Sequence, residues 1–168
     1  MPFVINRDGR PGRLATMPKP LGGHLLAGEM AAFAADGWTT IVSLLPMDQI
    51  LVSDLQAEAE AAAAEGMSFV LHPILDFGIP KMEPFIPVID DLATRLAAGE
   101  SIAIHCWMGI GRASLTAAAV LLVEGHEPDD AWTRITAARG KRVPENGRQT
   151  HFIDEYAEYL ANPTRLAL

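Results

Sequence analysis

The stretch that decides the fold is residues 101–112, which read Ser-Ile-Ala-Ile-His-Cys-Trp-Met-Gly-Ile-Gly-Arg. The apolar residues 101–104 predict a buried strand, and residues 112–124, followed by Gly125, predict a helix. A strand that enters a helix through a tight glycine-bearing loop directs successive backbone N–H groups and the positive end of the helix dipole at one centre. The sequence therefore predicts an anion-binding loop of a size that suits a phosphate group.

The loop combines two glycines, one guanidinium and one thiol. Gly109 and Gly111 permit backbone angles that a side chain would penalise, so that the loop N–H groups can turn inward. Arg112 can hold two phosphoryl oxygens as a planar fork, and Cys106 lies where these groups favour its thiolate form, which is a nucleophile. We expect phosphate to be bound by the residues of the loop, which are Trp107, Met108, Gly109, Ile110, Gly111 and Arg112.

The pattern His-Cys-x5-Arg at the end of a strand resembles the signature of the cysteine-dependent protein tyrosine phosphatases, and Gly-Ile-Gly-Arg is most similar to their compact dual-specificity branch. The resemblance implies a phosphocysteine intermediate on Cys106 and an aspartate general acid on a separate loop. Asp76 is the candidate acid, because it lies in the proline-bracketed segment 73–80 directly after an apolar strand predicted over residues 67–71. Both loops would leave the carboxyl ends of parallel strands, where open α/β sheets bind ligands.

Three further residues are candidates for supporting roles. Most relatives carry Ser or Thr after the signature arginine, where the hydroxyl is thought to stabilise the departing thiolate, but this chain has Ala113. Ser114 is one position further on, and whether it substitutes is open. His105 is expected to hydrogen-bond the loop backbone. Gln149 is interpreted as a solvated residue at the start of a helix, with the alternative that it orients the hydrolytic water.

The rest of the chain alternates predicted strands and helices, which indicates a parallel sheet with helical crossovers. We expect an α/β fold with a central, mostly parallel sheet of about five strands flanked by helices, as in dual-specificity phosphatases. Besides 67–71 and 101–104, the predicted strands are 3–5 and 13–15, paired as a hairpin, and 39–44. Ser53 and Gln56 form a predicted capping box for a helix that ends at Glu65. The other predicted helices are 26–35, 86–98, 112–124, 128–139 and 147–161.

Length and composition indicate one small domain over residues 1–168, since 168 residues at 49% hydrophobic support one well-buried core. The net charge of −8 disfavours nucleic acid and anionic membrane surfaces as partners. One cysteine, no signal-peptide pattern at the start and no continuous apolar run of about 20 residues favour a cytoplasmic protein. No cysteine or histidine spacing suggests a metal site, so we expect neither metal nor organic cofactor. We expect a monomer.

The expected function is phosphomonoester hydrolysis by a protein tyrosine or dual-specificity phosphatase. Apolar residues in the loop favour an aryl phosphate over a highly charged inositol ring, although Lys81, Lys141, Arg142 and Arg148 could supply charge from nearby loops. The same chemistry on an inositol phosphate or nucleotide is therefore an alternative. A phosphate-dependent binding module with little turnover is another, and Ala113 keeps it open. A rhodanese-type sulfur transferase is disfavoured by Arg112 and the acid loop.

Overall fold

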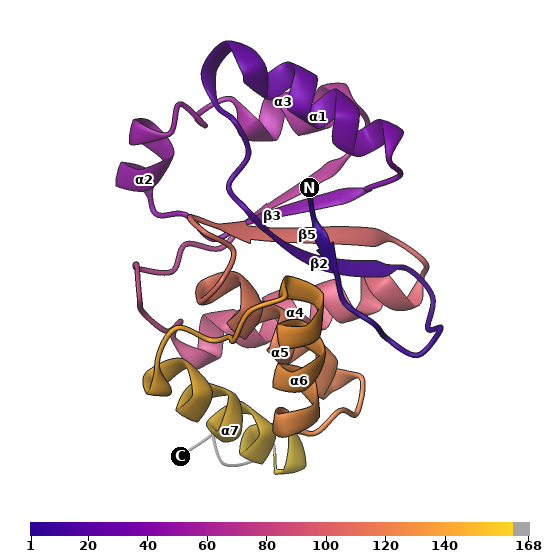
Figure 1. Ribbon diagram of the computed structural model, residues 1–168, viewed down its shortest axis with the longest axis vertical. Helices are drawn as coiled ribbons and strands as arrows, with labels where there is room; N and C mark the ends of the chain where they lie inside the picture. The colour runs from indigo at the N-terminus through magenta and orange to yellow at the C-terminus, as the bar shows by residue number, and fades with distance from the viewer. Residues whose placement is uncertain (163–168) are drawn as a thin grey trace.

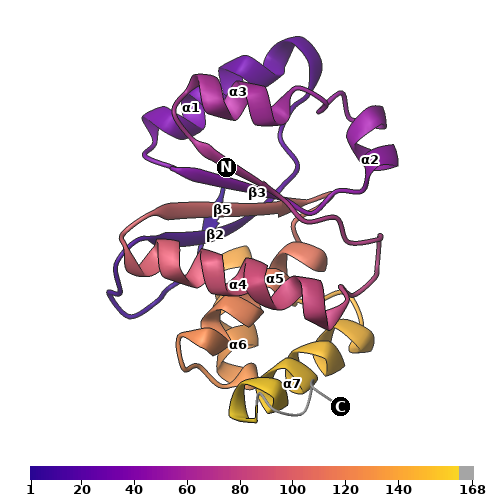
Figure 2. The same cartoon turned by 180° about the vertical axis from the view of Figure 1, so that it is seen from behind.

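A five-stranded sheet separates two layers of helices (Figures 1 and 2). The structure is a computed structural model and describes residues 1–162. Its strands are β1 (Phe3–Val4), β2 (Arg13–Pro18), β3 (Thr40–Ser43), β4 (Ser68–Leu71) and β5 (Ser101–Cys106), in the sheet order β1-β2-β5-β3-β4. Strand β1 pairs antiparallel with β2, whereas the pairs β2–β5, β5–β3 and β3–β4 are parallel. The predicted fold class, including the N-terminal hairpin, is confirmed.

The helices cover the two faces of the sheet unequally. Helices α1 (Leu26–Ala35) and α3 (Glu58–Ala64) cover one face, and α2 (Met47–Val52) lies beyond the carboxyl end of β3 (Figure 1). The opposite face carries α4 (Met82–Ala97), α5 (Arg112–Val123), α6 (Pro128–Arg139) and α7 (Gly147–Ala161). Across residues 1–162, every helix is too short or too polar to span a bilayer.

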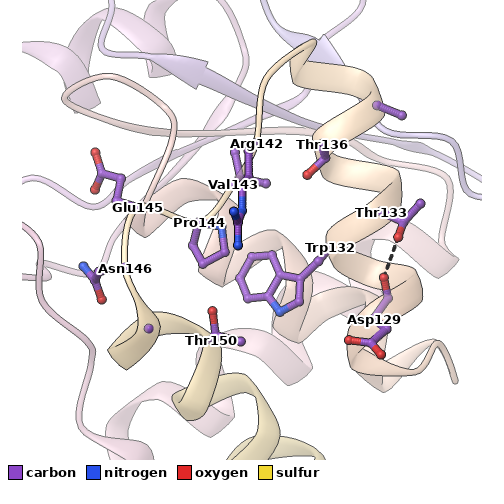
Figure 3. A pocket seen from close by; sticks show the side chains of 12 residues that line it. Asp129, Trp132, Thr133, Thr136, Arg142, Val143, Pro144, Glu145, Asn146 and Thr150 are labelled. Carbon is purple, nitrogen blue, oxygen red and sulfur yellow. Dashed lines mark hydrogen bonds between the residues drawn. The ribbon is translucent and has the colours of Figure 1, made fainter.

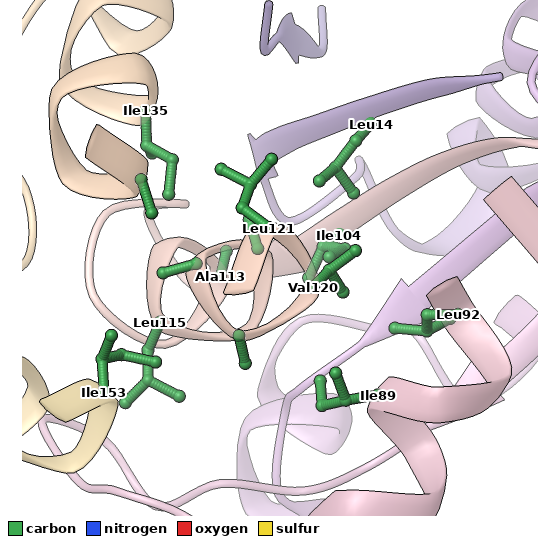
Figure 4. Packing of buried hydrophobic residues seen from close by; sticks show 14 of the residues in the cluster. Leu14, Ile89, Leu92, Ile104, Ala113, Leu115, Val120, Leu121, Ile135 and Ile153 are labelled. Atoms are coloured by element: carbon green, nitrogen blue, oxygen red, sulfur yellow. The ribbon is translucent and has the colours of Figure 1, made fainter. Parts of the chain in front are cut away.

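Because helices cover both faces, the inner strands are apolar on both sides. Alternate residues along the strands face opposite layers: Ala103 packs in the cluster under α1 and α3, while Ile102 and Ile104 pack in the cluster under α4 to α7. Residues 112–122 of α5 are all buried. Figure 4 shows the apolar part of this helix, with Val120 and Leu121 close to Leu14 of β2. The loop before α5 is therefore carried by a strand and a helix that are both fixed in the core.

Local sequence signals were wrong at two places. The capping box does not form: Ser53 ends α2, a helix that was not predicted, and α3 starts at Glu58 without a side-chain cap. Helix α4 begins at Met82 rather than 86 and so contains two prolines. Pro84 lies in the first turn, where its missing N–H has no helical partner, whereas Pro87 lies inside the helix. Helices α5, α6 and α7 begin at the predicted residues, and strand β5 extends the predicted 101–104 to Cys106.

The parallel strands bring three connections to one edge of the sheet, because strands that run in the same direction end at the same edge. The phosphate loop, residues 107–111, follows β5, and the acid loop, residues 72–81, follows β4. Helix α2 follows β3 at the same edge. This edge holds the candidate site.

Candidate active site

Strand β5 delivers Cys106 to the base of the phosphate loop. The side chain is buried, and its sulfur accepts a hydrogen bond of 3.2 Å from the backbone N–H of Gly109. Gly109 has a φ of +66°, and a Cβ atom there would lie 2.3 Å from the carbonyl of Met17 in β2. Both the backbone angle and the space require glycine at this position. The loop therefore folds back over the sulfur with an N–H directed at it.

Gly111 differs from Gly109, because the structure shows a close side-chain contact there rather than the backbone strain that was expected. Its φ is −87°, which any residue adopts, so the prediction that its backbone angle needs glycine is wrong. A Cβ atom at Gly111 would lie 2.0 Å from Oε2 of Glu145 and 2.8 Å from Nε2 of Gln149. Glycine here makes room for two side chains from the segment that precedes and begins α7. A larger residue would have to displace the ends of these two side chains, and only a contact between segments distant in sequence reveals this.

Arg112 is buried at the start of α5, with its guanidinium fixed by protein oxygens. Nη1 donates to Oε1 of Gln49 in α2 at 2.9 Å and to the carbonyl of Ile74 at 3.0 Å. Nη2 contacts Oδ1 of Asp76 at 2.9 Å, and Nε is buried without a partner among residues 1–162. A buried unpaired donor is costly unless a ligand satisfies it. The Nε–Nη2 edge is therefore the part of the guanidinium that can hold two phosphoryl oxygens.

Asp76 reaches the site from the acid loop, as expected. Its side chain is 45% exposed, and one carboxylate oxygen accepts the backbone N–H of Phe77 at 3.2 Å. Helix α7 holds this loop from the other side: Nδ2 of Asn146 donates to the carbonyl of Phe77, and Nε2 of Gln149 donates to that of Gly78. The structure thus places Asp76 against Arg112. Its role as general acid stays a prediction.

His105 does not contact the phosphate loop through its side chain in the way expected. Adjacent residues of a strand point to opposite faces, so Cys106 joins the cluster under α5 while His105 points toward α3. There its Nε2 lies 2.8 Å from Oε1 of Glu58, and both side chains are buried. The other ring nitrogen is buried without a partner among residues 1–162. The predicted bond to the loop backbone is therefore replaced by a carboxyl partner on the opposite layer.

The favoured interpretation of Gln149 as a solvated residue is wrong. Gln149 is fully buried, and its Oε1 accepts the backbone N–H of Glu145 at 3.1 Å while its Nε2 binds the acid loop. It therefore connects the segment before α7 to the acid loop. Ser114 is also fully buried, and its hydroxyl has no partner within the described chain. Ala113 packs in the same apolar cluster as Cys106.

Sequence reasoning missed several residues that contact the site. Gln49 holds Arg112, Glu58 holds His105, and Glu145 lies on Gly111. From α6, Nη2 of Arg139 donates to the carbonyl of Met108 at 3.2 Å, and burial lowers the pKa of this arginine. No local pattern marks these residues, because each acts across a gap of many positions in the chain.

A cleft of about 1100 Å³ has Glu145, the neighbour of Gly111, among its lining residues (Figure 3). It lies between α6, α7 and the segment that joins them, and its walls include Trp132, Thr136, Arg142, Pro144 and Thr150. Figure 3 shows the carboxylate of Glu145 pointing away from the Trp132 ring. Over residues 1–162, no group of three or more His, Cys, Asp or Glu side chains is arranged to hold a metal ion.

Comparison with known sequences gives a family match that includes both predicted loops. The family model for cyclin-dependent kinase inhibitor 3 matches residues 60–131. Cyclin-dependent kinase inhibitor 3 of Rattus norvegicus is 32% identical over 92 residues, which cover 54% of this chain and 43% of that protein. The Homo sapiens protein of the same name is 30% identical over the same shares. The match thus spans less than half the length of these relatives.

Solved structures share the fold over nearly the whole chain. Kinase associated phosphatase with serine in place of its catalytic cysteine superposes with a TM-score of 0.86 at 19% identity, covering 96% of each chain. Tk-PTP in its active form gives a TM-score of 0.72 at 22% identity, covering 92% of this chain and 96% of that one. PTPMT1 gives 0.76 at 15% identity, covering 96% and 98%. The chain thus has the fold of these phosphatases, and over residues 60–131, which include the His-Cys-x5-Arg loop, it is similar in sequence to the cyclin-dependent kinase inhibitor 3 family.

Proposed function

We propose that this protein hydrolyses phosphomonoesters through a phosphocysteine intermediate on Cys106. The observation that carries the proposal is the state of Arg112, whose buried Nε has no partner among residues 1–162 and whose Nη2 is bonded only to the exposed side chain of Asp76. A phosphoryl group that entered the loop could bind both nitrogens and would lie over the Cys106 sulfur. The sequence similarity to cyclin-dependent kinase inhibitor 3 over the residues that include both loops supports the same chemistry.

In the first step, the Cys106 thiolate attacks phosphorus in line with the leaving oxygen. The S–P bond forms as the P–O bond breaks, and its electron pair goes to the leaving oxygen, which takes a proton from Asp76. The loop N–H groups and Arg112 stabilise the charge on the equatorial oxygens. Asp76 is free for this task only once the phosphoryl oxygens replace it on Arg112, and its exposed position makes that movement inexpensive.

In the second step, water attacks phosphorus and gives a proton to Asp76, which now acts as a base. The S–P bond breaks and its electron pair returns to the Cys106 sulfur. Gly109 supplies the hydrogen bond to that sulfur, whereas Ala113 has no hydroxyl to offer a second one. Release of inorganic phosphate restores the starting state.

For the substrate, we propose phosphotyrosine in a protein, or another aryl phosphate. Apolar side chains are exposed beside the loops that carry the chemistry: Leu75 is 74% exposed, Phe77 61% and Met108 52%. An aromatic leaving group can pack against such side chains, whereas an inositol polyphosphate cannot. One structural relative is described as a kinase associated phosphatase, which also supports a phosphoprotein substrate. The reaction needs a reduced Cys106, which fits a cytoplasmic location.

The test is turnover of a chromogenic aryl phosphate by the purified chain and by Cys106→Ser. We expect the serine variant to retain less than about one per cent of the wild-type rate, because a hydroxyl stays un-ionised in the same loop, and to keep its affinity for phosphate. Phosphate binding without turnover in the wild-type protein would instead indicate a binding module. A panel of phosphotyrosine peptides, phosphoserine or phosphothreonine peptides and inositol phosphates then identifies the substrate class.

A further inference from the structure

Besides Asp76, a second carboxyl group lies at the phosphate loop, that of Glu145. Hydrogen bonds of Gln149 and Asn146 fix the backbone of this segment. The N–H of Glu145 donates to Oε1 of Gln149, and the next residue, Asn146, caps α7 by accepting the N–H of Gln149 at 3.1 Å. Asn146 also donates to the carbonyl of Phe77 in the acid loop. The segment is thereby tied both to α7 and to the acid loop.

The side chain of Glu145 lies against the last residue of the phosphate loop. Gly111 admits it, since a Cβ atom there would lie 2.0 Å from Oε2 of Glu145. The carboxyl oxygens have no hydrogen-bond or ion-pair partner within residues 1–162, in contrast to Asp76, which is bonded to Arg112. A polar group that the fold positions at an anion site without a partner is available to a ligand.

The electrostatic surroundings of Glu145 oppose its negative charge. Glu145 is exposed on one side, and partial burial on the other raises its pKa. Asp76 in the acid loop raises this pKa further, while Arg112 in α5 lowers it. A phosphoryl dianion in the loop would add negative charge close to this carboxyl and would neutralise Arg112. Each change favours the protonated carboxyl group.

We propose that Glu145 is a second acid of this site, and that its protonated carboxyl group donates a hydrogen bond to an oxygen of the phosphoryl group bound in the loop. The proposal rests on the proposed function only in that the loop binds such a group. Binding then takes up one proton from solvent, and release of phosphate returns it. The carboxyl acts on the bound anion itself, which distinguishes its role from proton transfer by Asp76 to the leaving oxygen.

The experiment measures sulfate binding by calorimetry in the Cys106→Ser variant at several pH values. Sulfate keeps its charge through the neutral range, and the serine removes titration of the thiol. If one proton is taken up on binding, affinity falls by about tenfold for each pH unit above the pKa of Glu145. Adding Glu145→Gln should remove that slope, and should give tighter binding at high pH, because a neutral amide N–H2 can donate the same hydrogen bond at any pH.

Two matched variants in the Cys106→Ser background separate the alternatives. Glu127→Gln tests a general loss of negative charge and should leave the slope unchanged, because Glu127 is the exposed residue that precedes α6, at the opposite end of that helix from Arg139. Asp76→Asn should retain the slope that belongs to Glu145 but should move it to lower pH, because the charge of Asp76 raises the pKa of Glu145. A slope that survives Glu145→Gln, or that disappears only with Asp76→Asn, would overturn the role of Glu145 alone. Failure of sulfate to bind at every pH would overturn the phosphate loop assignment, and with it the proposed function.

Discussion

Arg112 shows how single residues prepare the site before any substrate arrives. Its Nη1 is held by Gln49 and by the backbone of Ile74, so the guanidinium plane is fixed while its other edge stays available. Lysine in this position would offer a point charge without the planar fork. At the scale of the residue, the fold therefore fixes the orientation of the Nε–Nη2 edge of Arg112. Only the exposed side chain of Asp76 has to leave this edge before a phosphoryl group can bind there.

Asp76→Asn should lower kcat by about 10²- to 10⁴-fold for aryl phosphates with poor leaving groups, the usual range for loss of a general acid. The loss should shrink as the leaving group becomes a weaker base, because such a group needs less protonation. A series of substituted phenyl phosphates measures this dependence. If the loss were equal across the series, Asp76 would not be the acid, and Asp48 of α2, which adjoins the Gln49 that holds Arg112, would be tested next.

Ala113→Ser should change the second step only. If the missing hydroxyl slows hydrolysis of the phosphocysteine, stopped-flow assays of the wild-type protein will show a burst of phenol equal to the enzyme concentration, followed by slower turnover. The serine variant should raise the steady rate and leave the burst rate nearly unchanged.

The structure adds a control to this experiment. Ala113 is fully buried in an apolar cluster, so an added hydroxyl without a partner should cost about 1–3 kcal/mol of folding free energy. Denaturant unfolding of both proteins measures that cost separately from kinetics. A wild type without a burst, or a serine variant with an unchanged steady rate, would mean that the departure at position 113 has no kinetic consequence.

At the scale of elements, strand β5 connects the two layers at the site. Its alternation sends Cys106 into the layer of α5 and His105 into the layer of α3, where Glu58 meets the ring. The buried contact between His105 and Glu58 therefore fixes α3 to the strand that carries the nucleophile. Because both groups are buried, each relies on the other for its hydrogen bond.

Glu58→Ala should lower the free energy of unfolding by about 1–3 kcal/mol, because it leaves the buried His105 ring without its partner. In a chain of this size, each kcal/mol corresponds to a fall in Tm of about 2–4 °C. Thermal melts at neutral pH measure the effect. Glu60→Ala is the matched control, since Glu60 lies exposed on the same helix. Equal melting temperatures for the two variants would contradict a structural role for the pair.

At the scale of the whole molecule, folding stability should depend on pH through His72, the first residue of the acid loop after β4. Its ring packs near Phe85, with ring centroids 5.6 Å apart, and burial lowers its pKa below the ordinary value of 6.5. Below pH 6.5 the unfolded chain therefore binds more protons at this residue than the folded chain does. Folding stability attributable to His72 is present above that pH and is lost as the pH falls toward the folded pKa.

Replacing His72 with glutamine should reduce this acid sensitivity. We expect the difference in Tm between pH values of about 7.5 and about 5.5 to be smaller in His72→Gln than in the wild-type protein. His24→Gln provides the control, because His24 is exposed. An unchanged difference in Tm would assign the acid sensitivity to other groups.

Local pattern was sufficient for the elements that carry the site. The apolar run 101–104, the glycines of the loop and the helix that ends before Gly125 are signals within a few residues of one another, and α5, α6 and α7 begin where they predict. The same local signals placed Asp76 in a loop after a parallel strand. Parallel strands then bring the two loops to one edge without further information.

Tertiary structure alone decided which side chains contact the residues of the site. Glu58 pairs with His105, Gln49 with Arg112, and Glu145 with the space left by Gly111, and each contact joins segments that no local pattern connects. The capping box predicted at Ser53 fails for the same reason. The tendency of Ser53 to cap a helix depends on nearby residues, whereas the helix that it actually ends, α2, depends on tertiary packing. The sequence therefore determined which residues form the phosphate loop, and the packing of distant elements determined which side chains surround it.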